Sequence, residues 1–155
     1  MHRKTKIYLD TSVISHLDAE DVPEKMQHTR DFWERVKLGV EFDVCISKVT
    51  ERELYNCPEP KRSLMAGALR EIVSMFLDEN DEVEQLVNEY LLSNVLPPSC
   101  KDDLFHIAYA VVYRCDCIVS WNFKHLVNRK TMNRVNATNL SCGYQFIQIL
   151  SPEMV

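Results

Sequence analysis

The sequence predicts a three-layer α/β/α sandwich around a central, mainly parallel sheet of four to five strands. Short apolar runs at 6–9, 43–46, 117–120 and 145–150 are typical of buried strands, and longer segments with helical periodicity separate them. Parallel strands are joined by crossovers that usually contain a helix, which is the alternation seen here. With 155 residues, only three glycines and no linker or repeat, the chain is expected to form one domain over 1–155.

The first half of the chain alternates strand, helix, strand and helix. After the first strand, Pro23 suits the first turn of a helix, Trp33 lies on its apolar side, and Gly39 is a natural end. Ser47 follows the second strand as the first residue of another helix, which Pro58 ends. This half therefore predicts two neighbouring strands, each followed by a helix.

The second half predicts three helices and two strands. Helices are expected at 61–77 and 81–95, where apolar residues recur at helical spacing around a polar turn. A capping-box pattern from Ser99 to Asp102 then opens a helix that runs through Tyr113. The last two apolar runs supply the third and fourth strands.

Composition limits the classes of function. The formal net charge is −5, so the protein has no overall positive charge of the kind expected if its only role were to bind a nucleic-acid backbone. No secretory signal and no apolar stretch of about 20 residues is evident, and several of the six cysteines lie in apolar runs. We therefore expect a cytoplasmic protein with reduced cysteines and no membrane span. Cys115 and Cys117 resemble half of a zinc site, but no second pair has the matching spacing.

Three acids and one amide fall at similar places in this pattern. Asp10 ends the first strand, Glu53 lies in the helix after the second, Asp103 begins the helix before the third, and Asn122 follows the third. The carboxyl ends of parallel strands share one edge of a sheet, so these side chains are expected to converge. Oxygen-only clusters suit Mg²⁺ or Mn²⁺, which can activate water and stabilise charge on a phosphodiester.

Asp10 and Glu53 each have a structural alternative. Asp10 alone suits an Asx turn that caps the backbone of Ser12. The alternative for Glu53 is a solvated helix residue like Glu51, but its spacing from Val49 favours the inner face. We therefore retain both acids as site residues.

The helix that carries Asp103 offers two further candidates. Asp102 fits the capping box and is the better structural cap, whereas Asp103 shares a face with Ile107 and is expected to point inward. His106 lies one turn from Asp103 and is expected to be a half-buried neighbour more often than a general base.

Two further groups of residues complete the predicted site. Hydroxyl side chains are expected to donate hydrogen bonds that orient the acids, namely Thr11, Ser12 and Ser120. A locally basic stretch follows Asn122, and it suits either a solvated face or contact with an RNA backbone through Lys124, Arg129 and Lys130.

The chain contains, in order, LDTS at 9–12, SxxTxxEL at 47–54, DLFHIAYA at 103–110 and IVSWN at 118–122. These motifs resemble those of the PIN domain, with the VapC-type toxin ribonucleases of toxin–antitoxin pairs as the closest-looking branch. Late NLxxGY and SPE segments extend the resemblance over nearly the whole chain. Each motif is short, and their order and spacing carry the comparison.

The resemblance implies a metal-dependent endoribonuclease in which Asp10, Glu53 and Asp103 hold Mg²⁺ or Mn²⁺. It also implies a toxin that forms a homodimer and is held by a small antitoxin. The apolar residues of 61–95 are a candidate contact surface, and most of them are expected to pack in the core. PIN domains usually have a fourth acid at the position of Asn122. An amide can offer an oxygen but no charge, so a single metal or a loss of activity are both consistent with it.

Three other functions have less support in the sequence. A phosphatase with an aspartyl nucleophile at Asp10 would need a second aspartate two residues later, and this chain has Ser12 there. Nucleotide binding has no support because neither glycine-rich phosphate motif occurs. The serious alternative is a catalytically weak or inactive PIN-like module that binds a protein or RNA partner, and Asn122 is its main support.

Overall fold

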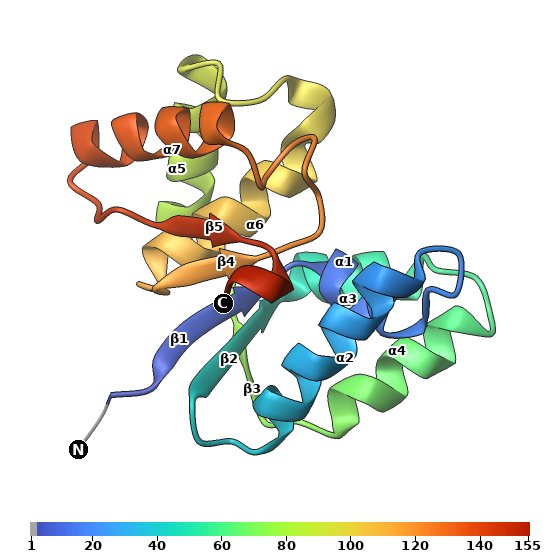
Figure 1. Ribbon diagram of the computed structural model, residues 1–155. Helices are drawn as coiled ribbons and strands as arrows, with labels where there is room; N and C mark the ends of the chain where they lie inside the picture. The colour runs from blue at the N-terminus through green and yellow to red at the C-terminus, as the bar shows by residue number, and fades with distance from the viewer. Residues whose placement is uncertain (1–2) are drawn as a thin grey trace.

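A computed structural model describes residues 3–155 and contains a five-stranded sheet in the order β3-β2-β1-β4-β5 (Figure 1). Every neighbouring pair of strands is parallel. The strands are β1 (Thr5–Leu9), β2 (Phe42–Ser47), β3 (Ser74–Leu77), β4 (Cys117–Val119) and β5 (Gln148–Leu150). The predicted parallel sheet is confirmed.

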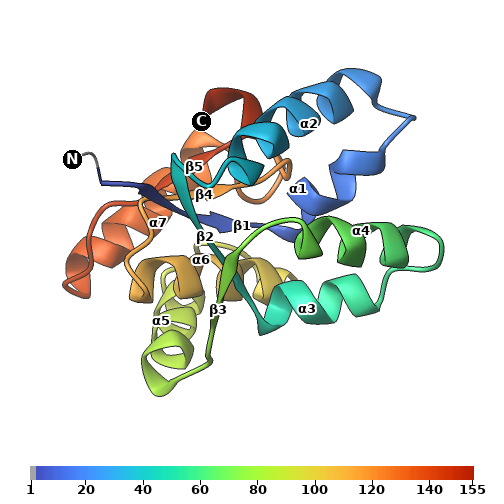
Figure 2. The ribbon, with the colours of Figure 1, turned by 90° about the horizontal axis from the view of Figure 1, so that it is seen from below.

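Residues 3–155 also form seven α-helices and three short 3-10 turns. The helices are α1 (Thr11–Ser15), α2 (Pro23–Lys37), α3 (Lys48–Tyr55), α4 (Lys61–Arg70), α5 (Asp81–Leu92), α6 (Lys101–Val112) and α7 (Arg129–Ser141). The 3-10 turns are η1 (His16–Asp18), η2 (Pro98–Cys100) and η3 (Pro152–Met154). Figures 1 and 2 show α1, α2 and α4 on one side of the sheet and α5, α6 and α7 on the other.

The sheet has a separate apolar core on each face. Alternate residues of β1 supply both cores, since Ile7 and Leu9 pack with α2 residues whereas Tyr8 packs with residues of α5 and α6. Both faces of the central strands are covered, which explains why these strands are nearly continuous apolar runs. The three-layer prediction is therefore confirmed.

Side-chain capping fixes the turn from β2 into α3. The Ser47 hydroxyl accepts a hydrogen bond from the Val49 N–H, and the Ser47 N–H donates to the Thr50 hydroxyl. This reciprocal capping box confirms Ser47 as the start of the helix that carries Glu53. The position of Glu53 relative to the sheet is thus encoded locally.

The predicted helix at 61–77 is wrong in its second half. Helix α4 ends at Arg70, and Ser74–Leu77 forms the edge strand β3 beside β2. The four residues of β3, Ser-Met-Phe-Leu, fit the hydrophobic pattern of a helix as well as that of a strand. Pairing with β2 decides between them, and that pairing is not visible in the sequence.

Several other boundaries differ from the predictions. The capping box at 99–102 is absent, since η2 leads directly into α6 without a side-chain cap. Helices α1 and α7 were not predicted, α5 ends three residues early at Leu92, and the last strand begins only at Gln148. Among residues 3–155, no helix has the length and apolar character that crossing a membrane requires.

Candidate active site

The three acids lie on or next to the strands and helices on which the sequence predicted them. Asp10 follows β1 and is the N-cap residue of α1, Glu53 is in α3, and Asp103 is in the first turn of α6. Ligand atoms of Asp10, Glu53 and His106 all lie within 4.8 Å of one another. Asp103 instead groups with Cys100 and His125, and after burial it is the nearby charges of Asp10 and Glu53 that raise the pKa of its carboxyl.

Asp10 is buried and held by two hydroxyls. Asp10 as a whole residue is only 5% exposed. The Ser12 and Ser120 hydroxyls donate to the same oxygen, Oδ2, at 2.6 Å and 2.7 Å. Ser12 in turn accepts from the Trp121 N–H at 2.9 Å, so the end of β1 and the end of β4 are tied together through this carboxylate. The two hydroxyls hold the Asp10 carboxylate in one orientation.

Glu53 reaches the same place from α3. Its Oε1 atom accepts from the Thr11 hydroxyl at 2.9 Å and lies 2.5 Å from His106 Nε2. Burial alone would raise the pKa of the Glu53 carboxyl, but its hydrogen bonds with His106 and Thr11 lower the pKa below the usual value. Glu53 is therefore held as a carboxylate.

His106 is completely buried and connects the acids to the sheet. Its Nε2 atom is 3.4 Å from Asp10 Oδ1, and its Nδ1 atom is 2.6 Å from the Tyr8 hydroxyl, which also bonds Ser47 Oγ at 2.7 Å. Burial would lower the pKa of His106, but Tyr8, Glu53 and Asp10 together raise it well above its ordinary value. A protonated imidazole stabilises the two carboxylates beside it.

Asp103 and Asp102 have clearly different surroundings. The Asp103 side chain is 17% exposed and its Oδ2 atom is 3.1 Å from His125 Nδ1. Asp102 is 54% exposed and forms a surface ion pair with Arg52. Burial and the nearby charge of Asp10 raise the pKa of the Asp103 carboxyl. The inward face predicted for Asp103 agrees with these exposures.

Asn122 uses its side-chain oxygen to order the loop after β4. Oδ1 accepts from the His125 N–H at 3.0 Å, and the Asn122 carbonyl accepts from the N–H groups of Leu126 and Val127. The Asn122 N–H donates to Ser120 Oγ, the same atom that donates to Asp10. Asn122 therefore positions the loop beside the acids and has one Oδ1 lone pair engaged there.

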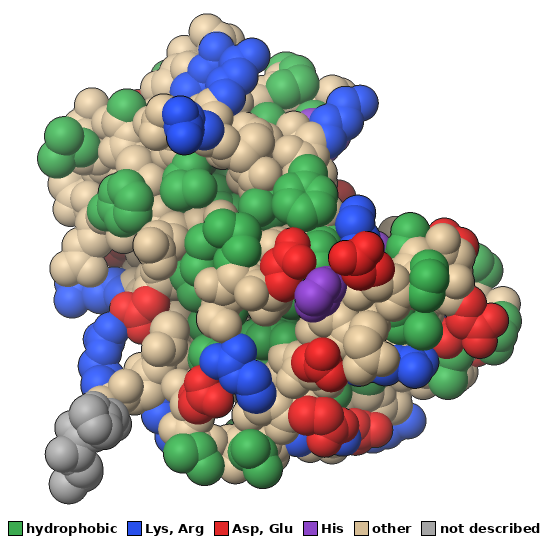
Figure 3. All heavy atoms as spheres, in the orientation of Figure 1, with side chains coloured by type: hydrophobic (Ala, Val, Ile, Leu, Met, Phe, Trp, Pro, Cys, Tyr) green, Lys and Arg blue, Asp and Glu red, His purple; other side chains and the backbone are tan. Residues whose placement is uncertain are grey.

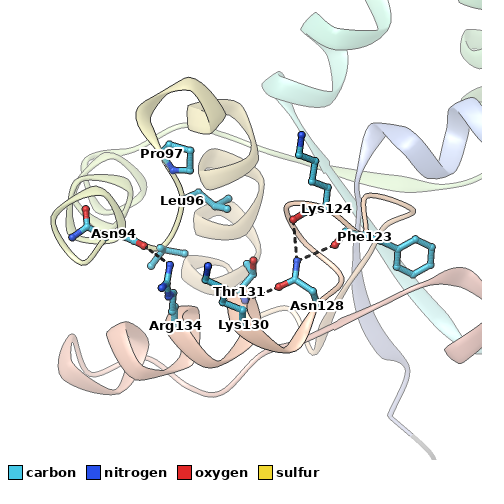
Figure 4. Close-up of a pocket in the computed structure, with 10 residues that line it drawn as sticks. Asn94, Leu96, Pro97, Phe123, Lys124, Asn128, Lys130, Thr131 and Arg134 are labelled. Carbon is cyan, nitrogen blue, oxygen red and sulfur yellow. Dashed lines mark hydrogen bonds between the residues drawn. The ribbon is translucent and has the colours of Figure 1, made fainter.

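A basic pocket of about 460 Å³ opens between this loop, α7 and the segment before η2 (Figure 4). Its charged lining comes from Lys124, Lys130 and Arg134, none of which forms an ion pair with another residue of 3–155. Arg129, the third predicted RNA contact, is exposed nearby but does not line the pocket. Figure 3 shows Lys and Arg side chains with few carboxylates near them over the α7 side, whereas carboxylates interspersed with Lys and Arg cover the α2 side.

The three carboxylates share one feature that matters for ligand binding. Each uses one oxygen for its hydrogen bonds, namely Oδ2 of Asp10, Oε1 of Glu53 and Oδ2 of Asp103, and Asp10 Oδ1 also lies 3.4 Å from His106 Nε2. Within residues 3–155, the second oxygen of each accepts no hydrogen bond from the protein. Free carboxylate oxygens in a buried acidic setting are the donors that Mg²⁺ and Mn²⁺ prefer, so the residues present fit such an ion.

No protein-family model and no curated protein matches this sequence. A search of solved structures matches a chain from the crystal structure of VapBC2 from Rickettsia felis bound to a DNA fragment from their promoter. The match has a TM-score of 0.56 and 13% sequence identity, and it covers 77% of this chain and 90% of that chain. This chain has a PIN-like fold.

The PIN-like fold explains the placement of the predicted acids but not all of the surrounding residues. Sequence reasoning ranked His106 as a neighbour, whereas the structure places it between Asp10 and Glu53. A signal was present, because His106 is one turn from Asp103 on a helix whose inner face is otherwise apolar. The role of Tyr8 had no sequence signal, since an aromatic residue in a buried strand is ordinary core.

Proposed function

We propose that this protein is a metal-dependent endoribonuclease that hydrolyses RNA phosphodiester bonds. The observation that carries the proposal is the meeting of Asp10, Glu53 and His106 at the carboxyl edge of a parallel sheet, with Asp103 beside them. This edge is where open α/β sheets place their ligands. The PIN-like fold adds support, because the sequence motifs at these positions resemble the family's metal ligands.

Some residues of such a site would bind the cation, and others would orient its ligands. Asp10, Glu53 and Asp103 would hold Mg²⁺ or Mn²⁺ through their second oxygens, while Thr11, Ser12 and Ser120 keep the carboxylates oriented. A divalent cation bound there supplies positive charge for the scissile phosphate and lowers the pKa of a water molecule. His106 positions Glu53 and Asp10 and balances part of their charge while no cation is present.

The RNA backbone is proposed to lie over the basic pocket. Lys124 and Lys130 line it, and Arg129 is exposed beside it. Positive side chains that are free of ion pairs are well suited to phosphate oxygens, and they supply a local positive charge that the net charge of −5 does not.

We further propose that the protein is the toxin of a toxin–antitoxin pair, acting in the cytoplasm as a homodimer. The structural neighbour comes from a VapBC2 complex, and all six cysteines of this chain are unpaired, as expected in a reducing compartment. The dimer surface is proposed at the edge strand β3, where Val73 is 94% exposed and Met75 and Phe76 are each 47% exposed. Sedimentation that gives a monomer at micromolar concentration would contradict the dimer.

One observation favours a second candidate, a PIN-like module that binds RNA or protein without cleaving. Asn122 stands where the family usually has an acid, and its Oδ1 atom is engaged by the His125 N–H. A site with three carboxylates retains the ligands for one hard cation, so cleavage remains our main proposal.

An RNA cleavage assay separates the two candidates. Wild type and Asp10→Asn are incubated with structured and single-stranded RNA in Mn²⁺, in Mg²⁺ and with a chelator. Cleavage by wild type that needs the metal, falls at least about 100-fold in Asp10→Asn and persists in the surface control Asp102→Asn supports the nuclease. Equal residual activity in wild type and Asp10→Asn would refute it, and metal-independent RNA binding by both would favour the module.

A further inference from the structure

A second group of ligating side chains lies next to the acidic site. Cys100 ends η2, Asp103 is in the first turn of α6, and His125 is in the loop after β4. One ligand atom from each lies within 4.8 Å of the others. Two segments of the chain, the start of α6 and the loop after β4, thus bring a thiol, a carboxylate and an imidazole close together.

Two of the three separations between these atoms are close to those of tetrahedral coordination through Nδ1, although Cys100 Sγ also lies 3.6 Å from His125 Nε2. His125 Nδ1 is 3.1 Å from Asp103 Oδ2 and 3.8 Å from Cys100 Sγ. Bond lengths of ~2.3 Å to sulfur and ~2.0–2.1 Å to nitrogen or oxygen place tetrahedral ligand atoms about 3.6 Å (S to N) and about 3.4 Å (N to O) apart. The observed separations differ from these by only a few tenths of an ångström, which a rotation of the side chains supplies.

The ligand types differ from those of the neighbouring acidic site. A thiolate and an imidazole favour Zn²⁺ over Mg²⁺, which takes oxygen ligands almost exclusively. Three protein ligands also leave a fourth position for water, as in zinc sites that are not purely structural. We propose that Cys100, Asp103 and His125 form a binding site for Zn²⁺, distinct from the Mg²⁺ or Mn²⁺ site proposed above.

The surrounding structure holds these ligands in place. The Cys100 residue is 9% exposed and sits at the start of α6, while the His125 backbone is fixed by Asn122 Oδ1. On binding, the Cys100 thiol releases its proton to solvent, and the imidazole carries its remaining proton on Nε2 so that Nδ1 can coordinate. Asn122, which lacks the charge of an acid, thereby contributes to this site through the loop.

A consequence follows that rests on the proposed nuclease function. Asp103 belongs to both ligand sets, so Zn²⁺ bound by Cys100 and His125 draws Asp103 away from the Mg²⁺ or Mn²⁺ ion. Zn²⁺ is then an inhibitor of RNA cleavage whose effect depends on Cys100. The binding of Zn²⁺ itself does not depend on whether the protein is a nuclease.

The site is tested by titrating the full-length, metal-free protein with Co²⁺, a spectroscopic substitute for Zn²⁺. Coordination by a thiolate gives a near-ultraviolet charge-transfer band, expected here with one ion per chain and abolished by a slight excess of Zn²⁺. Cys100→Ser should remove the band and weaken Zn²⁺ affinity at least about 100-fold, because loss of even an outer-shell partner costs 10–100-fold. Cys142→Ser, at an exposed cysteine, is the matched control and should keep the band.

Two further variants make the test decisive. His125→Gln removes a ligand without touching a cysteine and should weaken Zn²⁺ binding as Cys100→Ser does, with folding of both checked by circular dichroism. Asp10→Asn should keep the cobalt band while losing RNA cleavage. No saturable band in wild type, or a band that survives Cys100→Ser, would overturn the proposal.

The inhibition is measured separately. Micromolar Zn²⁺ in the presence of millimolar Mg²⁺ should reduce RNA cleavage by wild type at least about 10-fold and leave Cys100→Ser nearly unaffected. A cobalt band without any RNA cleavage would support the zinc site while the nuclease proposal fails. Equal inhibition of both proteins would overturn the shared role of Asp103.

Discussion

Adjacent aspartates on α6 provide a matched pair for testing the acidic site. Asp103→Asn and Asp102→Asn remove the same charge from the same helical turn, so general effects of net charge on stability are equal. Asp103 is largely buried beside Asp10, whereas Asp102 is exposed and pairs with Arg52. Differences between the two variants therefore report on the site.

Without metal, Asp103→Asn should be the more stable variant. Burial and the charge of Asp10 raise the pKa of Asp103 in the folded protein. An acid whose pKa is raised on folding loses stability as the pH rises from its ordinary value through its raised value, because the unfolded chain ionises first. Asn does not ionise, so the Asp103→Asn variant does not lose this stability at neutral pH. Asp102→Asn removes only an exposed ion pair, a change of about 0–1 kcal/mol.

With metal, the order should reverse. A ligand present at 100 times its dissociation constant stabilises the folded state by about 2.7 kcal/mol. For a chain of 155 residues, each kcal/mol shifts the melting temperature by about 2–4 °C, so wild type and Asp102→Asn should gain about 5–11 °C in saturating Mn²⁺. Asp103→Asn should gain little, because one of three carboxylate ligands is gone.

The assay is thermal unfolding followed by circular dichroism, with and without Mn²⁺, for wild type and both variants. A chelator should return wild type and Asp102→Asn to their metal-free melting temperatures. The reasoning fails if Asp103→Asn keeps the full Mn²⁺ shift, or if wild type shows none.

Three further predictions concern the partners of the site. Ser120→Ala removes a hydroxyl from Asp10 and should weaken Mn²⁺ affinity by about 10–100-fold in calorimetry, with unchanged affinity counting against a positioning role. Tyr8→Phe removes the buried hydroxyl bonded to His106 and should lower the free energy of unfolding by about 1–3 kcal/mol in urea, whereas no loss would contradict the hydrogen-bonded chain. Lys130→Ala should weaken RNA binding and lower the slope of log affinity against log salt by about 0.7, and an unchanged slope would place RNA elsewhere.

The parts of the fold that could be predicted are those with strong local signals. The central strands are apolar on both faces, so β1 and β4 were visible as continuous runs. Ser47 marked the start of α3 because its capping box is local. Once these elements were placed, parallel topology alone brought the carboxyl ends together and predicted a common location for Asp10 and Glu53.

The parts that could not be predicted depend on contacts between distant segments. Strand β3 exists because it pairs with β2, and its four residues fit a helix equally well. Helix α7 has few apolar residues, since only one side of it is buried, and its start at Asn128 is a side-chain cap that was not recognised. His125 reaches Asp103 only through the loop geometry that Asn122 fixes, which no spacing in the sequence shows.

The charges of the site favour one hard cation over two. Asp10 and Glu53 converge with Asp103 beside them, and His106, with its raised pKa, compensates part of the charge of Asp10 and Glu53 in the metal-free protein. Burial, followed by the charges of Asp10 and Glu53, raises the pKa of Asp103, and the nearby His106 and His125 oppose that rise. One divalent ion matches three carboxylates closely, whereas a second would need another acid at the position of Asn122. Asn122 instead adds no charge and uses its amide oxygen to hold His125 beside Asp103. Asn122 thus stands where a second Mg²⁺ or Mn²⁺ ion would need an acid. It instead holds His125, the imidazole ligand of the proposed Zn²⁺ site.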